Sequence, residues 1–134
     1  MKKSIILYRI GAVVFILVGL LHLMAHFTVP DNNSLNELLR AMEDYKIEMM
    51  GEHNLLKFYM GFSLMMGFLL TALGLVNFIF SKSITKGSIY TNVLISAIGF
   101  IIAFNYFHVL AYGFVFIALI SYSCSLIFYK KAAS

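Results

Sequence analysis

Two histidines four residues apart, His22 and His26, are the residues of this chain whose type and spacing most favour chemistry. Side chains at positions i and i+4 of a helix lie on the same side, so a helix through this segment brings the two imidazoles together. His22 falls about one to two helical turns inside the end of a long apolar run. An ionisable group at such a depth in a membrane is costly if it faces lipid, which makes this pair a candidate site.

Further polar groups stand where the neighbouring apolar runs begin or end. Glu52 and His53 precede the second run, and His108 follows the third. We expect all four histidines to lie in the same half of the molecule. Imidazoles with a carboxylate could bind zinc, copper or iron, with His22 and His26 as the metal ligands. They could equally perform acid–base catalysis, because histidine exchanges protons near neutral pH.

A structural interpretation of these histidines stands beside the chemical one. The chain has no His-Glu-x-x-His motif, so the pair His22 and His26 alone is a weak indication of a metal site. A serine hydroxyl or a backbone carbonyl could supply the partner that His22 needs. The residues do not specify a cofactor.

A second polar group, Arg9, Asn77 and Asn92, is expected at the opposite end of the apolar runs. We expect Arg9 to extend toward lipid phosphates, as long basic side chains do at membrane boundaries. Asn77 and Asn92 are positioned to bond with each other between the second and third runs. An anionic headgroup site at this cluster is the functional alternative.

The elements that position these groups are four apolar runs, over residues 5–27, 55–80, 89–107 and 111–129. Each is close to the ~20 residues that cross a bilayer as a helix. Of the 134 residues 61% are hydrophobic and 12% are charged, which argues against a soluble domain, where about a quarter are charged. We therefore predict an all-α protein, a transmembrane four-helix bundle that forms a single domain over residues 1–134. The basic residues form no patch with interleaved aromatics, which argues against nucleic acid as a partner.

The charges are sorted along the chain. All six acidic residues lie between the first two runs. Seven basic residues flank the runs on one side, and three lie on the other; the seven are Lys2, Lys3, Arg9, Lys82, Lys86, Lys130 and Lys131. Because cytoplasmic segments of membrane proteins are enriched in Lys and Arg, we expect both termini in the cytoplasm and residues 28–54 outside it.

An amphipathic helix is predicted in that outer segment. Ser34 and Glu37 have the spacing of a capping box. Apolar residues then recur at near-helical spacing, namely Leu35, Leu38, Leu39, Met42, Met49 and Met50. We expect this helix to lie on the extracytoplasmic surface or to cover that end of the bundle.

Small residues form one face of each apolar run, as close helix packing in lipid requires. The faces are Gly11, Val18 and Gly19 together with His22 and His26; Ser63, Gly67, Thr71 and Gly74; Asn92, Ser96, Gly99 and Ala103; and Ala118, Ser121 and Ser125. Tyrosines near the ends of the runs, Tyr8 among them, are predicted to be interfacial anchors.

Two segments resemble small bacterial four-span membrane proteins loosely related to the DoxX-like group. They are Arg9-x-Gly11-Ala12-Val13-x-Phe15-x-Leu17-x-Gly19-x-x-His22 and Phe58-Tyr59-x-Gly61-Phe62-Ser63-Leu64. The resemblance implies a multi-pass protein of the bacterial inner membrane without an established activity. A more distant similarity to the sterol-isomerase-like four-helix fold transfers no catalytic residue, because the buried carboxylates of that family are missing here.

Two functions follow from these observations. The first is a membrane protein that binds a lipid or other apolar small molecule, or that serves as a subunit of a membrane assembly. The second is a metal-binding or acid–base site at the outer end of the bundle. A relay of two haems is disfavoured, because the cytoplasmic half contains no histidine, and a small multidrug exporter is disfavoured, because no run contains an interior carboxylate.

Overall fold

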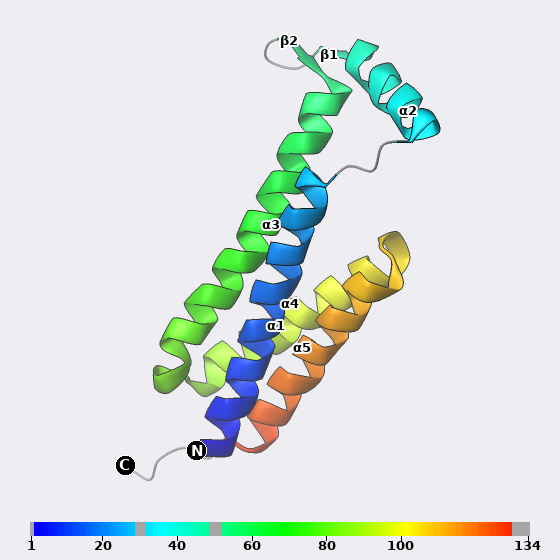
Figure 1. Ribbon diagram of the computed structural model, residues 1–134. Coiled ribbons are helices and arrows are strands. Elements are labelled where there is room, and N and C mark those ends of the chain that lie inside the picture. Colours follow the sequence, from blue (N-terminus) through cyan, green and yellow to red (C-terminus); the bar gives the residue numbers. More distant parts are fainter. Residues whose placement is uncertain (1, 29–31, 49–51, 130–134) are drawn as a thin grey trace. The chain divides into compact units, whose positions relative to one another are not determined.

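The computed structural model describes residues 2–28, 32–48 and 52–129 (Figure 1). Four of its helices are long and apolar enough to cross a membrane. They are α1 (Lys2–Phe27), α3 (Leu55–Ile79), α4 (Lys86–Tyr106) and α5 (Val109–Ile127). The four predicted helices are therefore confirmed. A 3-10 helix, η1 (Phe80–Ser83), prolongs α3, and Thr85 forms a reciprocal capping box with Ser88 at the start of α4.

The helices belong to two compact units. The first unit comprises the chain up to Val18 and from Leu70 onward, and the second comprises Gly19–Leu69. The helices α1 and α3 each contribute one part to either unit, whereas α4 and α5 lie wholly in the first.

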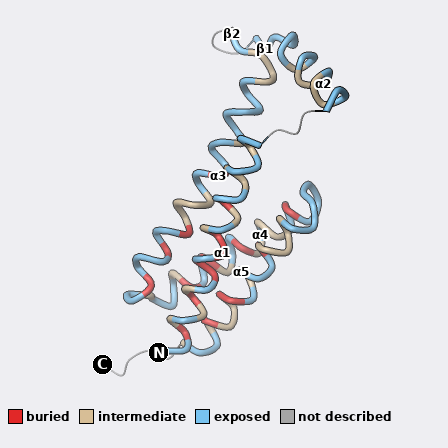
Figure 2. The backbone as a smooth tube through the Cα atoms, viewed as in Figure 1, coloured by how far each residue is buried: buried red, intermediate tan, exposed pale blue. Residues whose placement is uncertain are grey.

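The core of the first unit is built around Tyr122 of α5, which is fully buried. The rings of Tyr8 and Tyr122 meet edge to face, with centroids 5.1 Å apart. Gly11 lets α1 approach this ring, because a Cβ atom there would lie 2.8 Å from Cζ of Tyr122. Figure 2 shows the buried positions along α1, α4 and α5. The other buried members of this core are Val14, Phe15, Ile89 and Ala118.

The structure corrects the prediction for Tyr8. This side chain is 2% exposed and is therefore no anchor among lipid headgroups. Its hydroxyl donates a 2.7 Å hydrogen bond to Oδ1 of Asn77. The hydroxyl therefore does not need a water molecule or a headgroup as its hydrogen-bond partner.

The small-residue faces pack helices together as predicted. On α4 the buried positions include Asn92, Ser96 and Ala103, and on α5 they include Ala118, Ser121 and Ser125. On α3, Gly74 lies against the backbone of α1, where an added Cβ would be 2.7 Å from the carbonyl oxygen of Ala12. Close approach of this kind is how helices associate when lipid provides no hydrophobic driving force.

Ser4 and Ser125 tie α1 to α5. Each hydroxyl donates a 2.9 Å hydrogen bond to the backbone carbonyl of the other residue, and both residues are fully buried. The two bonds satisfy both hydroxyl donors without water.

The second unit contains a helix, α2 (Asn33–Asp44), in the segment where an amphipathic extracytoplasmic helix was predicted; its extracytoplasmic position stays a prediction. Leu35, Leu39 and Met42 are half-buried, while Glu37 and Glu43 are exposed. The helix does not continue through residues 45–48 as predicted; Met49 and Met50 lie outside the described residues. The predicted capping box of Ser34 and Glu37 is also wrong, because the side chain of Asn32 caps the helix by accepting from the amide of Ser34 at 3.0 Å.

After α2 the chain forms two short strands, β1 (Lys46–Glu48) and β2 (Glu52–Asn54). They pair antiparallel with Ile47 opposite His53. The sequence did not predict this short addition to an otherwise helical protein, whose helices confirm the all-α prediction. Asn54 ends the pair and caps α3, because its Oδ1 accepts a 2.9 Å hydrogen bond from the amide of Lys57.

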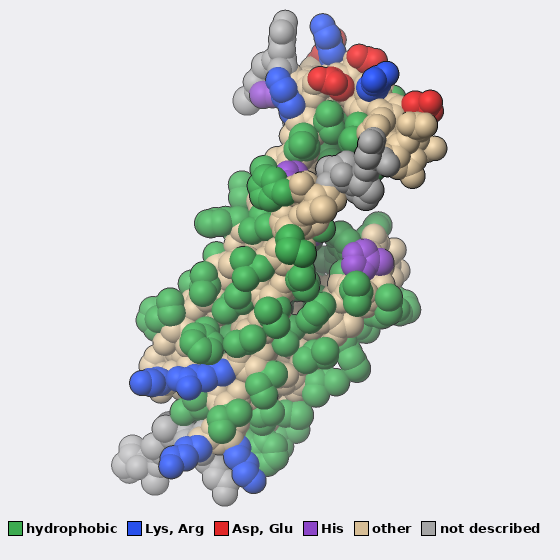
Figure 3. Space-filling model, viewed as in Figure 1, with side chains coloured by type: hydrophobic (Ala, Val, Ile, Leu, Met, Phe, Trp, Pro, Cys, Tyr) green, Lys and Arg blue, Asp and Glu red, His purple; other side chains and the backbone are tan. Residues whose placement is uncertain are grey.

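Charge is distributed unequally between the units. All the acidic residues that the structure describes lie in the second unit. Figure 3 shows them on α2 and the strand pair. The described basic residues of the first unit are Lys2, Lys3, Arg9, Lys82 and Lys86, and no described acidic residue accompanies them there.

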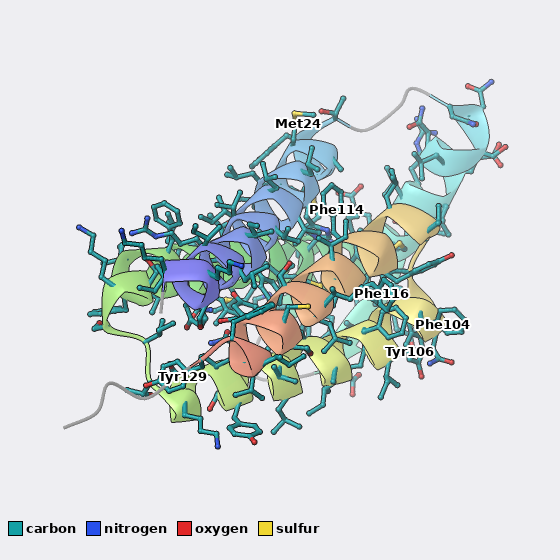
Figure 4. All side chains as sticks on the ribbon, turned by 90° about the horizontal axis from the view of Figure 1, so that it is seen from below. Met24, Phe104, Tyr106, Phe114, Phe116 and Tyr129 are labelled. Carbon is teal, nitrogen blue, oxygen red and sulfur yellow. The ribbon has the colours of Figure 1, made fainter. Side chains whose placement is uncertain are left out.

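Aromatic side chains cover the outer faces of α4 and α5. Phe104 and Tyr106 project from the end of α4 and are 61% and 82% exposed (Figure 4). Phe116 of α5 is 45% exposed, and its ring lies 5.3 Å from that of Phe100. Exposed aromatic and aliphatic surface on this scale suits contact with lipid rather than with water.

Candidate functional site

His22 and His26 both contact a single hydroxyl, that of Ser63 on α3. Nε2 of His22 lies 3.2 Å from Oγ of Ser63, and Nδ1 of His26 lies 3.0 Å from the same atom. The prediction that the two imidazoles share one side of the helix is confirmed. A serine hydroxyl, one of the two kinds of partner that the structural interpretation allowed for His22, is present as well.

Small residues one turn further along the helices allow this contact. A Cβ atom on Gly67 would lie 3.2 Å from the carbonyl oxygen of Gly19 and 2.6 Å from Cγ of Leu23. The two backbones therefore approach closely beside the histidines, which brings the short side chain of Ser63 within reach of both rings. The three polar side chains are half-buried.

The other predicted site residues lie in different places. His53 is an exposed residue of β2. Glu52 stands opposite Glu48 in the strand pair, and its side chain lies outside what the structure describes. His108 is exposed and precedes α5 as its N-cap, without a capping side-chain hydrogen bond. His108 thus belongs to the first unit and His22, His26 and His53 to the second, so a common histidine cluster stays a prediction.

Over residues 2–28, 32–48 and 52–129, no group of three or more His, Cys, Asp or Glu side chains is arranged to hold a metal ion. His22 and His26 would supply two nitrogen ligands, whereas structural zinc sites use four protein ligands and catalytic sites three. A metal bound by this pair stays a prediction.

The predicted hydrogen bond between Asn77 and Asn92 is present in the first unit. Nδ2 of Asn77 donates to Oδ1 of Asn92 at 2.7 Å. Nδ2 of Asn92 lies 3.0 Å from the hydroxyl of Tyr8 and 2.9 Å from the backbone carbonyl of Ser88. The amide of Asn77 also lies 3.5 Å from the hydroxyl of Tyr122. These groups satisfy one another, which is what keeps a buried polar cluster stable.

Sequence reasoning missed Tyr8 and Tyr122 as members of this cluster. Tyr122 gave a usable signal, since it lies inside the last apolar run between Ser121 and Ser125, on the small-residue side of that helix. A tyrosine so far from the ends of its run needs a buried partner for its hydroxyl.

Arg9 lies near this cluster on α1 and is held in one orientation. Its Nε donates a 2.7 Å hydrogen bond to Oγ of Ser81, a fully buried residue of η1. The guanidinium carbon lies 5.5 Å from the ring centroid of Phe78, within the range of a cation–π contact. Bonding through Nε leaves the two terminal amino groups to bind a further acceptor.

A shallow apolar groove extends to both sides of Arg9 along α1. It has a volume of about 290 Å³ and is lined by Arg9 with Ile6, Ile10, Val13 and Val14 of the same helix. A fixed cation next to an apolar groove is an arrangement suited to an amphipathic anion.

Comparison of the chain with protein-family models, with curated proteins and with solved structures gives no match.

Proposed function

We propose that this protein is a multi-pass membrane protein that binds an anionic phospholipid at Arg9, with the phosphate on the guanidinium and an acyl chain along the adjacent groove. The observation that supports this most directly is the fixed guanidinium, bonded to Ser81 through Nε and placed over Phe78. Planar guanidinium groups bind phosphate oxygens through two parallel hydrogen bonds, and a group already held in place loses less entropy in doing so.

Charge in the first unit supports the same ligand. The described basic residues there are Lys2, Lys3, Arg9, Lys82 and Lys86. Each basic residue near a bilayer surface contributes roughly 1 kcal/mol of attraction to anionic lipids. We infer that this end of the molecule faces the cytoplasmic leaflet of a bacterial inner membrane, and that α2 with the strand pair lies on the extracytoplasmic side, because cytoplasmic segments are enriched in Lys and Arg.

The groove fits the apolar part of such a lipid. Ile6, Ile10 and Val13 are 57%, 42% and 38% exposed and lie along α1, with Ile6 about one turn before Arg9 and Val13 about one turn after it. From Arg9 to Val13 the helix rises about 6 Å, enough for the first few methylene groups of an acyl chain.

The test is a comparison of lipid affinities by native mass spectrometry of the full chain in detergent, with phosphatidylglycerol as the anionic lipid and phosphatidylcholine as the zwitterionic one. Arg9→Gln should weaken phosphatidylglycerol binding about 10- to 100-fold, which corresponds to a charge-assisted hydrogen-bonding pair of about 1.5–3 kcal/mol. Arg9→Lys keeps the charge but loses the planar guanidinium group. Its affinity for phosphatidylglycerol should therefore lie between that of the unchanged protein and that of Arg9→Gln.

Lys86→Gln is the matched control, because it removes one positive charge from the same unit at an exposed residue. It should weaken phosphatidylglycerol binding only about fivefold, as expected for about 1 kcal/mol of surface attraction. Equal losses for Arg9→Gln and Lys86→Gln, or no preference of the unchanged protein for phosphatidylglycerol, would show that Arg9 forms no specific phosphate site.

A further inference from the structure

The contact of two imidazoles with one hydroxyl restricts where the protons are. A serine hydroxyl has one proton to donate and two lone pairs. When both imidazoles are neutral and the hydroxyl donates to one of them, the other ring donates to Oγ. Both rings could instead donate to the two lone pairs of Oγ, in which case they hold opposite tautomers and the hydroxyl proton points away from both. In the state where the hydroxyl donates to one ring, the protonation of His22 and that of His26 are therefore linked through Ser63.

The linked state, in which the hydroxyl donates to one ring, has two arrangements. In the first, Nε2–H of His22 donates to Oγ and the hydroxyl donates to Nδ1 of His26, so both rings hold their proton on Nε2. In the second, Nδ1–H of His26 donates to Oγ and the hydroxyl donates to Nε2 of His22, so both rings hold their proton on Nδ1. In either arrangement the two neutral rings are the same tautomer.

We propose that His22, Ser63 and His26 form a proton relay along α1. A proton taken up at Nε2 of His26 makes that ring cationic. Its Nδ1 proton passes to Oγ of Ser63 while the hydroxyl proton passes to Nε2 of His22. The proton on Nδ1 of His22 then leaves, so one proton enters, one leaves and the arrangement changes from the second to the first.

Position along the helix gives the relay a direction. His26 lies one residue from the end of α1, and His22 lies one turn further in, about 6 Å along the axis. The relay thus moves a proton between the end of a membrane-length helix and a point inside it. On the facing helix, the titratable side chain one turn from Ser63 on the same side is Tyr59, which is 56% exposed.

A purely structural role predicts something different. A serine that only satisfies His22 would fix one arrangement, and His26 would have no influence on it. The proposed relay requires both arrangements to be populated and the two rings to change together. This inference is independent of the lipid site, because its residues and those of the Arg9 site belong to different units.

The test is nitrogen-15 NMR of the full chain labelled at histidine, in lipid bilayers, at a pH where the rings are neutral. Ring nitrogen shifts identify the tautomer of each imidazole, and the exposed His53 and His108 serve as internal references. We expect equal tautomer populations for His22 and His26, with exchange between the two forms at one shared rate.

Ser63→Ala should abolish the equality and the shared rate, and Ser63→Thr, which keeps a hydroxyl, should restore both. Ser83→Ala is the control, since Ser83 is exposed and its hydroxyl donates to the carbonyl of Phe80. Opposite tautomers in the unchanged protein, a single fixed arrangement without exchange, or the same shared behaviour after Ser63→Ala would each overturn the relay. The tautomer populations and their exchange are measured on the unchanged protein, so the test does not depend on whether a substituted protein folds.

Discussion

Replacement of Gly74 by alanine should separate α1 from α3 in the first unit. A Cβ atom at this position would lie 2.6 Å from the backbone nitrogen of Ile16 and 2.7 Å from the carbonyl oxygen of Ala12. Carbon contacts are optimal near 3.5–4.0 Å, so α1 must move by about 1 Å, and a gap of that size forfeits a quarter to a half of the attraction between the atoms lining it.

The expected cost follows from two opposing terms. Overpacking of a tight interface costs typically 1–3 kcal/mol, and two of the three nearest atoms here belong to backbone that cannot rotate aside. Alanine in place of glycine in a helix contributes about 1 kcal/mol in the opposite direction. We expect Gly74→Ala to be destabilised by up to about 2 kcal/mol relative to the unchanged protein.

Gly113→Ala is the matched control, because a Cβ atom at Gly113 meets nothing within 4 Å. This variant should gain stability from helix propensity alone, by about 0.5–1 kcal/mol. Unfolding of the three proteins in the same detergent micelles, followed by circular dichroism, measures both changes. If Gly74→Ala unfolds at the same midpoint as Gly113→Ala, the close approach of α1 to α3 is not what stabilises the unit.

Two further predictions concern buried and capping amides. Asn92→Leu should destabilise the protein by about 1–3 kcal/mol for each buried group it leaves unpaired, Tyr8 and Asn77 among them, in the same detergent assay. Asn105→Leu should have little effect, because Asn105 is exposed and bonds only to the carbonyl of Ile101, and equal effects of the two substitutions would contradict a stabilising cluster. Asn32→Ala should destabilise α2 locally by about 1 kcal/mol, seen as hydrogen exchange about fivefold faster in its first turn, and unchanged exchange there would show that this cap is dispensable.

Much of the fold was predictable because lipid-spanning helices obey two simple constraints. Length and hydropathy located the four long helices, and the rule that close helix contacts need small residues identified faces that the structure confirms, such as the one carrying Gly67 and Gly74. The helical period also predicted correctly that His22 and His26 lie on one side.

The features that the sequence did not predict depend on contacts between residues far apart in the chain. Tyr8 looked like an interfacial residue because its position near the end of a run is typical of anchors, and only its contact with Asn77, 69 residues away, reveals a core role. Ser63 was recognised as part of a small-residue face, but its pairing with both histidines depends on how α1 and α3 are aligned along their axes.

The end of α2 was missed for a local reason. Met42, Met49 and Met50 match helical spacing, but Ile47 between them lies in a strand paired with His53. Three-residue strands are too short for an alternating pattern to be recognised. The cap was misassigned because Asn32 and Ser34 are both good N-cap residues, and spacing alone does not choose between them.

The paired serines of α1 and α5 have a consequence for biosynthesis. Ser4 is synthesised 121 residues before Ser125. When α1 first enters the bilayer, the Ser4 hydroxyl therefore has no Ser125 to bond with. During that interval it can bond only within its own helix or to headgroups. The first unit thus closes only after α5 has been inserted, and a chain arrested before α5 would expose the polar edge of α1 to the quality-control proteases of the membrane.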